Sequence, residues 1–254
     1  MTMTSDLRAV LTGTAGARGV EGECHLGRGS AGACRAQYTL SRSDPATLAS
    51  PRDYLAFPLD RHYPPRTNCM RTIAVVVGSI SRDSINRRVA RALEALGRDR
   101  FAFIDVRIDE FPLFNVDRAK DPPEPVVRMK KEIADADAVI IVTPEHNRSI
   151  PAALKNAIDW GSRPAGQSCW IGKPAAILGA STGQTGTAAA QQHLRTILSP
   201  QQVIMMGQPE LYIHWKAGLL DDAGNVADET VKKRMELFLE RFAAWVERVG
   251  ARSA

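Results

Sequence analysis

The chain has 254 residues, of which 44% are hydrophobic, 24% charged and 6% aromatic, and its formal net charge is +5. These values are typical of a globular protein and exclude collagen-like and wholly disordered chains. The longest uncharged apolar runs lie around 73–80 and 138–144. Because a bilayer is crossed by roughly 20 apolar residues, the sequence predicts no membrane-spanning helix.

Residues 1–69 differ in character from the rest of the chain. They hold eight Arg, no Lys, seven Gly and five Pro, with no sustained period of 2 or 3.6 residues. Such a segment cannot build a hydrophobic core. Two interpretations stay open: a disordered leader, or a mis-called upstream start with Met70 as the true first residue, of which we favour the second. Six acidic residues and the absence of an amphipathic pattern argue against a transit peptide.

The four cysteines are Cys24, Cys34, Cys69 and Cys169. With His25, the first three form no CxxC or HxxxH spacing, so we expect no zinc site and no metal. The first residues also lack the apolar core of a secretory signal. A low cysteine count without such a signal indicates a reducing, cytoplasmic compartment.

Residues 70–254 have the pattern of one folded domain. This segment carries 25 basic and 22 acidic side chains in 185 residues, enough for a single core. The basic residues are spread along predicted helices and are not interleaved with aromatic residues. We therefore expect no nucleic-acid binding.

Five nearly continuous apolar runs predict buried strands. They cover Thr72–Val77, Phe101–Val106, Ala138–Thr143, Ala175–Gly179 and Val203–Met206. Strands of this kind are covered on both faces, as in a parallel sheet. Segments with one apolar face lie between them, and the last, from Val231 to Val249, predicts a helix whose Met and aromatic side chains belong to the core.

The alternation predicts an α/β protein with a doubly wound, five-stranded parallel sheet in the order 2-1-3-4-5. Ligands of such sheets bind beyond the C-terminal ends of the strands. The loops after the first, third and fourth strands are therefore the candidate sites.

The first loop is GSISRDSINRRVA at 78–90. It lacks the three-glycine fingerprint of a dinucleotide-binding turn, and it lacks the Gly-Lys-Ser/Thr ending of a loop that binds a nucleoside triphosphate. It does offer hydroxyl, amide and guanidinium donors at a helix start, namely Ser79, Ser81, Arg82, Ser84 and Asn86. Such donors suit a single phosphate monoester. The alternative is structural, with Ser84 capping the helix and the other serines forming the turn.

The second loop, TPEHNRSIPAALKNAIDW at 143–160, follows the third strand. Glu145, His146 and Asn147 would lie at the strand end where a ligand binds, between flanking prolines. The same residues also suit a turn at the surface, so a purely structural role stays open.

The third loop contains a formal GxSxG at 179–183, which raises a hydrolase alternative. A catalytic triad would need an acid and then a histidine after Ser181. Only Glu210 and His214 follow in that order, four residues apart, which disfavours a hydrolase.

A second interpretation of the third loop is a surface for a flat ring. Gly183 and Gly186 would let the backbone approach such a ring closely. Ser181 and Thr182 would present N–H and hydroxyl donors to its polar edge.

With these three loops, the chain from Met70 onward closely resembles the NADPH-dependent FMN reductase family of flavodoxin-like proteins, especially its quinone and chromate reductase branch. The resemblance rests on GSISRDSIN after the first strand, PEHN and SIPAALKNAIDW after the third, and STGQTG and LR after the fourth. It covers nearly all of 70–254 and implies a flavodoxin-like fold. Residues 1–69 have no counterpart in it.

The resemblance also implies a binding site for FMN. The residues implied for its phosphate are Ser79, Arg82, Ser84 and Asn86. Those implied for the isoalloxazine are Pro144, Glu145, His146 and Asn147 on one side and Ser181, Thr182, Gly183 and Gly186 on the other. The family commonly has Tyr where this chain has His146, so the ring at this position is smaller and titratable.

The function implied is that of an oxidoreductase in which bound FMN takes hydride from NADPH or NADH and passes it to an acceptor, in a ping-pong cycle. The flavin supplies the chemistry, so no protein general acid or base is expected. Quinones are the expected acceptors, with chromate or free flavin as further ones. A homodimer or homotetramer is expected by analogy only.

Two alternatives remain at this stage. One is a flavin reductase that supplies reduced FMN to a partner monooxygenase. The other is a non-catalytic flavodoxin-type electron carrier, which typically has a strongly acidic surface. The basic charge of 70–254 argues against the second.

Overall fold

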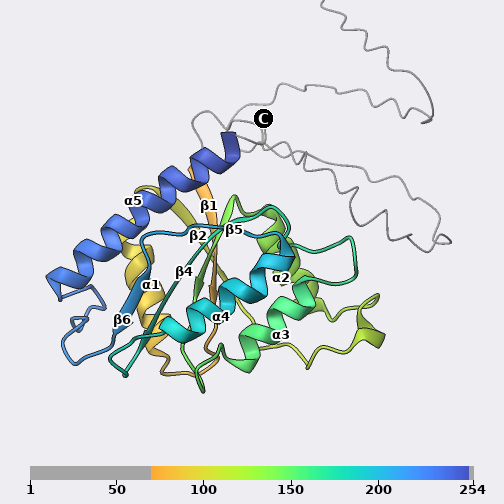
Figure 1. Ribbon diagram of the computed structural model, residues 1–254, viewed down its shortest axis with the longest axis horizontal. Coiled ribbons are helices and arrows are strands. Elements are labelled where there is room, and N and C mark those ends of the chain that lie inside the picture. Colours follow the sequence, from red (N-terminus) through yellow and green to blue (C-terminus); the bar gives the residue numbers. More distant parts are fainter. Residues whose placement is uncertain (1–69, 252–254) are drawn as a thin grey trace, which may run out of the picture. The chain divides into compact units, whose positions relative to one another are not determined.

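The computed structural model describes residues 70–251 (Figure 1). Its strands are β1 (Arg71–Val77), β2 (Phe101–Val106), β3 (Ala138–Val142), β4 (Pro174–Ser181), β5 (Ile204–Met205) and β6 (Leu211–His214). Its helices are α1 (Ile85–Gly97), α2 (Glu124–Asp135), α3 (Ala152–Gly161), α4 (Ala188–Leu198) and α5 (Glu229–Ala251), with 3-10 turns at η2 (Val116–Arg118) and η3 (Ser199–Gln201). The leader and the cysteines before Met70 lie outside the described residues.

The strands form one parallel sheet in the order β2-β1-β3-β4-β5, which confirms the predicted order. The position at the edge of the sheet next to β4 is occupied by two short strands. β5 pairs with the start of β4 at Pro174 and Ala175, and β6 pairs with its end, from Leu178 to Ser181. The fifth predicted strand is thus shorter than expected, and β6 was not predicted.

Helices cover both faces of this sheet (Figure 1). Ile73, Val75 and Val77 of β1 pack into a core with α1 and α5. Their neighbours Ala74 and Val76 pack into a second core with α2, α3 and α4. Because a strand sends alternate side chains to opposite faces, both sets must be apolar, which explains the uninterrupted apolar runs of the sequence.

The terminal helix α5 packs as its pattern predicts. Met235, Phe238 and Phe242 are at most 1% exposed and belong to the core shared with α1. The ring of Phe242 lies 5.9 Å from that of Phe101 on β2, centroid to centroid. Although α5 has 23 residues, neither it nor any other helix within 70–251 is apolar enough along its length to cross a bilayer.

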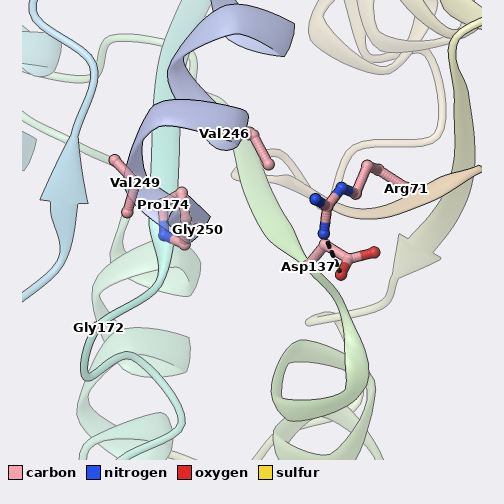
Figure 2. Close-up of a pocket in the computed structure, with 7 residues that line it drawn as sticks. All are labelled: Arg71, Asp137, Gly172, Pro174, Val246, Val249 and Gly250. Atoms are coloured by element: carbon pink, nitrogen blue, oxygen red, sulfur yellow. Dashed lines mark hydrogen bonds and ion pairs between the residues drawn. The ribbon is translucent and has the colours of Figure 1, made fainter. Parts of the chain in front are cut away.

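At the N-terminal ends of the strands, Asp137 joins β3 to β1. Asp137 is the residue before β3. Its carboxylate accepts the N–H of Thr72 at 2.8 Å and lies 3.5 Å from the guanidinium of Arg71 (Figure 2). The cavity beside this ion pair measures about 10 Å³, and its other lining residues are Gly172, Pro174, Val246, Val249 and Gly250. A space of this size holds no more than one water, so this end of the sheet is a packing feature.

We expect Asp137→Ala to lower the free energy of unfolding by about 1–3 kcal/mol, because the partly buried N–H of Thr72 loses its acceptor. Urea unfolding measures the change. Asp135→Ala is the matched control, since the Asp135 side chain is 60% exposed in its ion pair with Lys131. The control should change the same free energy by less than about 0.5 kcal/mol. Equal losses in the two variants would contradict the role given to Asp137.

Candidate functional site

The three predicted loops meet at the C-terminal edge of the sheet, because β1, β3 and β4 are neighbours. The N–H of Gly78, directly after β1, donates to the carbonyl of Val142 at 2.8 Å. A Cβ on Gly78 would lie 3.1 Å from Leu154 and 3.4 Å from Pro144. The first and second loops are therefore in direct contact.

The first loop has the donors of an anion site. Ser84 is the N-cap of α1, as the structural interpretation predicted, and its hydroxyl oxygen accepts the N–H of Arg87 at 3.2 Å. The N–H groups of Ile85 and Asn86 have no acceptor within 70–251. Arg82 is exposed and makes no hydrogen bond or ion pair with any described residue. Free amides at the positive end of a helix, with an unpaired guanidinium beside them, favour an anion.

Two further hydroxyl and amide residues of this loop are already engaged in local contacts. Ser79 is half-buried, and its oxygen accepts the N–H of Ser81 at 3.4 Å. Asn86 is 1% exposed, and its side chain exchanges two hydrogen bonds with the backbone of Ala180, at 2.9 and 2.8 Å. The side chain of Asn86 therefore joins α1 to β4, which leaves its backbone N–H for the predicted phosphate contact.

The second loop forms a tight turn. His146 and Ser149 exchange both backbone hydrogen bonds at 2.9 Å, and the residues between them, Asn147 and Arg148, have φ angles of 51° and 63°. Two successive positive φ values are typical of a type I′ turn. The side chains of His146 and Asn147 are exposed on this turn.

Glu145, at the base of this turn, faces the protein. Its side chain is 9% exposed, and Oε2 accepts the N–H of Ala190 in α4 at 3.1 Å. Oε1 lies 3.4 Å from the guanidinium of Arg148. The carboxylate therefore links the second loop to the helix that follows the third loop.

The start of the third loop requires glycine at 179. A Cβ on Gly179 would lie 2.0 Å from the carbonyl oxygen of Thr143 and 2.4 Å from the hydroxyl of Thr187. Gly186 has a φ of 60°, and a Cβ there would lie 3.0 Å from the backbone nitrogen of Ile213. Gly186 is buried and lets the loop pack on β6, and its contact with a ligand stays a prediction.

The remaining residues of the third loop are accessible. Ser181 is half-buried, and its hydroxyl accepts the N–H of Gly183 at 2.9 Å. Thr182 and Gly183 are exposed. Among the residues 70–251 that are not its chain neighbours, a Cβ on Gly183 would come near the Ser181 hydroxyl alone, at 3.3 Å. Open backbone of this kind can lie against a flat ring.

The hydrolase alternative finds no support in these contacts. Ser181 and His214 are paired in register on β4 and β6. No hydrogen bond between their side chains occurs among the described residues. The carboxylate of Glu210 instead accepts the side-chain amide of Gln192 at 3.0 Å.

The end of β6 is a fourth part of this edge that sequence analysis missed. The N–H of Trp215 donates to the carbonyl of Ser181 at 2.8 Å, and the guanidinium of Arg88 lies 4.8 Å from the Trp215 ring centroid. Burial raises the pKa of Tyr212 above its ordinary value. The sequence of Leu211–His214 alternates over only four residues, which is too short to reveal this strand.

The family model described as NADPH-dependent FMN reductase matches residues 71–217, which include all of these loops. This chain belongs to the NADPH-dependent FMN reductase family. It is therefore an oxidoreductase with a flavodoxin-like fold, FMN as its cofactor and NAD(P)H as electron donor. The predicted family, fold class, enzyme class and cofactors are confirmed.

Individual relatives agree with the family match. A 2-hydroxy-1,4-benzoquinone reductase of a Burkholderia species is 49% identical over 174 residues, which cover 68% of this chain and 95% of the relative. A quinone reductase of Pseudomonas putida is 46% identical, over 69% of this chain and 95% of the relative. The solved structure of FerB, a flavoenzyme NAD(P)H:(acceptor) oxidoreductase from Paracoccus denitrificans, is 42% identical, with a TM-score of 0.68 over 70% of this chain and 98% of FerB.

We expect Gly179→Ala in this FMN reductase to lower the free energy of unfolding by about 3 kcal/mol or more, because the new methyl would overlap rigid backbone. Thermal unfolding followed by circular dichroism measures the loss. Gly183→Ala is the matched control, since the space around Gly183 is open. The control should cost less than about 1 kcal/mol. Equal stability of the two variants would show that β3 and β4 separate more easily than the structure indicates.

Proposed function

We propose that this FMN reductase transfers electrons from NAD(P)H to quinones, with chromate and free flavin as further acceptors. The proposal rests on one observation. The start of α1, with donors that have no acceptor within 70–251, lies at the same C-terminal ends of the strands as the accessible second and third loops. Relatives that are 46% and 49% identical and are named as quinone reductases support the choice of acceptor.

The donors at α1 fit the phosphate of FMN. Arg82 would form a charge-assisted contact, and the hydroxyl hydrogens of Ser79 and Ser84 are free to donate because only their oxygens are engaged as acceptors. The free N–H groups of Ile85 and Asn86 would complete the phosphate site.

The second and third loops fit the ring of FMN. The segment Pro144–Asn147 would lie on one side of the ring and the segment Ser181–Gly183 on the other. When bound, FMN supplies the chemistry by accepting hydride from NAD(P)H and giving it to the acceptor. The protein orients the two substrates and needs no acid or base of its own. His146, smaller than the family's usual Tyr, would leave more room for an acceptor on its side.

Three further assignments belong to this proposal. Residues 70–254 form the reductase domain, and the protein works in the cytoplasm. It forms a homodimer or homotetramer, which is supported by the apolar side chains of Leu113 and Val116, 83% and 69% exposed. Exposed large apolar groups in one short segment are typical of a protein interface.

We expect the purified protein to retain FMN through gel filtration and to give parallel lines in double-reciprocal plots when NADPH and a quinone are varied. Parallel lines follow because one site would serve both substrates in turn. Loss of FMN on the column, with free flavin as the better acceptor, would favour the flavin reductase alternative. Retained FMN with very slow oxidation of NADPH would favour the electron carrier.

We expect Arg82→Ala to weaken FMN binding by about 1–3 kcal/mol, or roughly 5- to 150-fold in Kd, through loss of a charge-assisted contact. Binding of riboflavin, which lacks the phosphate, should not change. Quenching of flavin fluorescence measures both affinities. Arg91→Ala is the control, because Arg91 is also exposed on α1 but lies beyond its first turn. An unchanged FMN affinity in Arg82→Ala would remove Arg82 from the phosphate site.

A further inference from the structure

We propose that Glu145 is a positioning residue that caps α4 from the second loop and so sets the separation of the two turns on either side of the flavin ring. The inference rests on the proposed function, because it assumes that the ring lies between these turns. It assigns Glu145 a role other than the ring contact that the sequence suggested.

Helix α4 lacks a cap of its own. Thr187 occupies the N-cap position but makes no side-chain hydrogen bond to the helix amides. Its hydroxyl is fully buried and accepts the side-chain amide of Gln191 at 2.9 Å. The first turn of α4 also contains no acidic residue. The amides at this helix start therefore need an acceptor from elsewhere in the chain.

Glu145 provides this acceptor. Its Oε2 lies 3.1 Å from the N–H of Ala190, in the first turn of α4, and its side chain is 9% exposed. A carboxylate is favoured at this end of a helix by the macrodipole and by the charge-assisted hydrogen bond. Partial burial strengthens both effects, because water screens them less.

A second contact holds the other end of the same turn. A 2.7 Å hydrogen bond joins the hydroxyl of Ser149 to Nδ1 of His193, one helical turn further along α4. The turn from Glu145 to Ser149 is stiff in itself, because His146 and Ser149 exchange two backbone hydrogen bonds. The second loop is therefore attached to α4 at both of its ends.

This attachment fixes one wall of the proposed ring site relative to the other. Helix α4 is the direct continuation of the third loop, so a turn bound to α4 moves together with that loop. Losing the Glu145 contact would let the two turns separate. The effect should fall on the ring and not on the phosphate, which α1 would hold.

The test compares the affinities of FMN and riboflavin for the full chain by fluorescence quenching. We expect Glu145→Ala to raise both dissociation constants by the same factor, about 10-fold, because both ligands carry the ring. Glu145→Gln keeps an acceptor without the charge and should raise them by no more than about 3-fold. Thr196→Ala, on the exposed side of α4, is the matched control and should leave both constants within about 2-fold.

A second set of variants decides the question if Glu145→Ala does not fold. Ser149→Ala and His193→Ala, both at the surface, should each raise the Kd of riboflavin about 2- to 3-fold. The double variant should show no further increase, because the two residues share one contact.

The outcomes separate the inference from the proposed function. A folded Glu145→Ala protein that binds riboflavin as the unaltered chain does would overturn the inference, and so would a loss confined to FMN. With Glu145→Ala unfolded, strict additivity of the Ser149 and His193 effects, or no effect of either, would overturn it. A failure of the unaltered chain to bind either flavin would instead contradict the proposed function.

Discussion

The paired hydrogen bonds between the Asn86 side chain and the backbone of Ala180 hold the site together across the sheet. They join the start of α1 to the C-terminal end of β4, between residues 94 positions apart in the sequence. The anion site belongs to α1 and the third loop belongs to β4, so this contact sets the span between them. It is stable because both partners are buried, and either one left alone would be a buried, unsatisfied polar group.

Much of the fold could be predicted because the apolar runs are unambiguous. Strands such as β1 and β3 are buried on both faces, which leaves uninterrupted Val, Ile and Ala in the sequence. The two short edge strands, β5 and β6, were harder to predict. Within β6 only Leu211 and Ile213 are fully buried, and an alternation over four residues is too short to identify a strand. Its existence depends on the length of β4, which extends beyond β5 and offers a free edge to a second short strand.

The hydrogen bonds of the candidate site could be predicted where both partners lie close together in the sequence. Capping of α1 by Ser84 was one of the two interpretations of the first loop, because capping depends on residues within one turn. The partners of Asn86 and Glu145 were not predictable, since each lies in a different loop or strand of the fold. An amide or a carboxylate in a loop is readily interpreted as a ligand contact when its distant backbone partner is unknown. Both side chains join distant parts of the fold, whereas Arg82 and Thr182 are exposed.

Gly179 adds a constraint of a different physical kind from the charges around it. The carbonyl oxygen of Thr143 occupies the place where a Cβ at 179 would lie, so the close approach of β3 and β4 excludes any larger residue at this position. Excluded volume does not depend on ionic strength, whereas the field of an exposed guanidinium such as Arg82 is screened within about 10 Å at 0.1 M salt. The two ends of the candidate site therefore respond differently to salt: the close packing at Gly179 does not change, while the attraction of an anion to Arg82 weakens as the salt concentration rises.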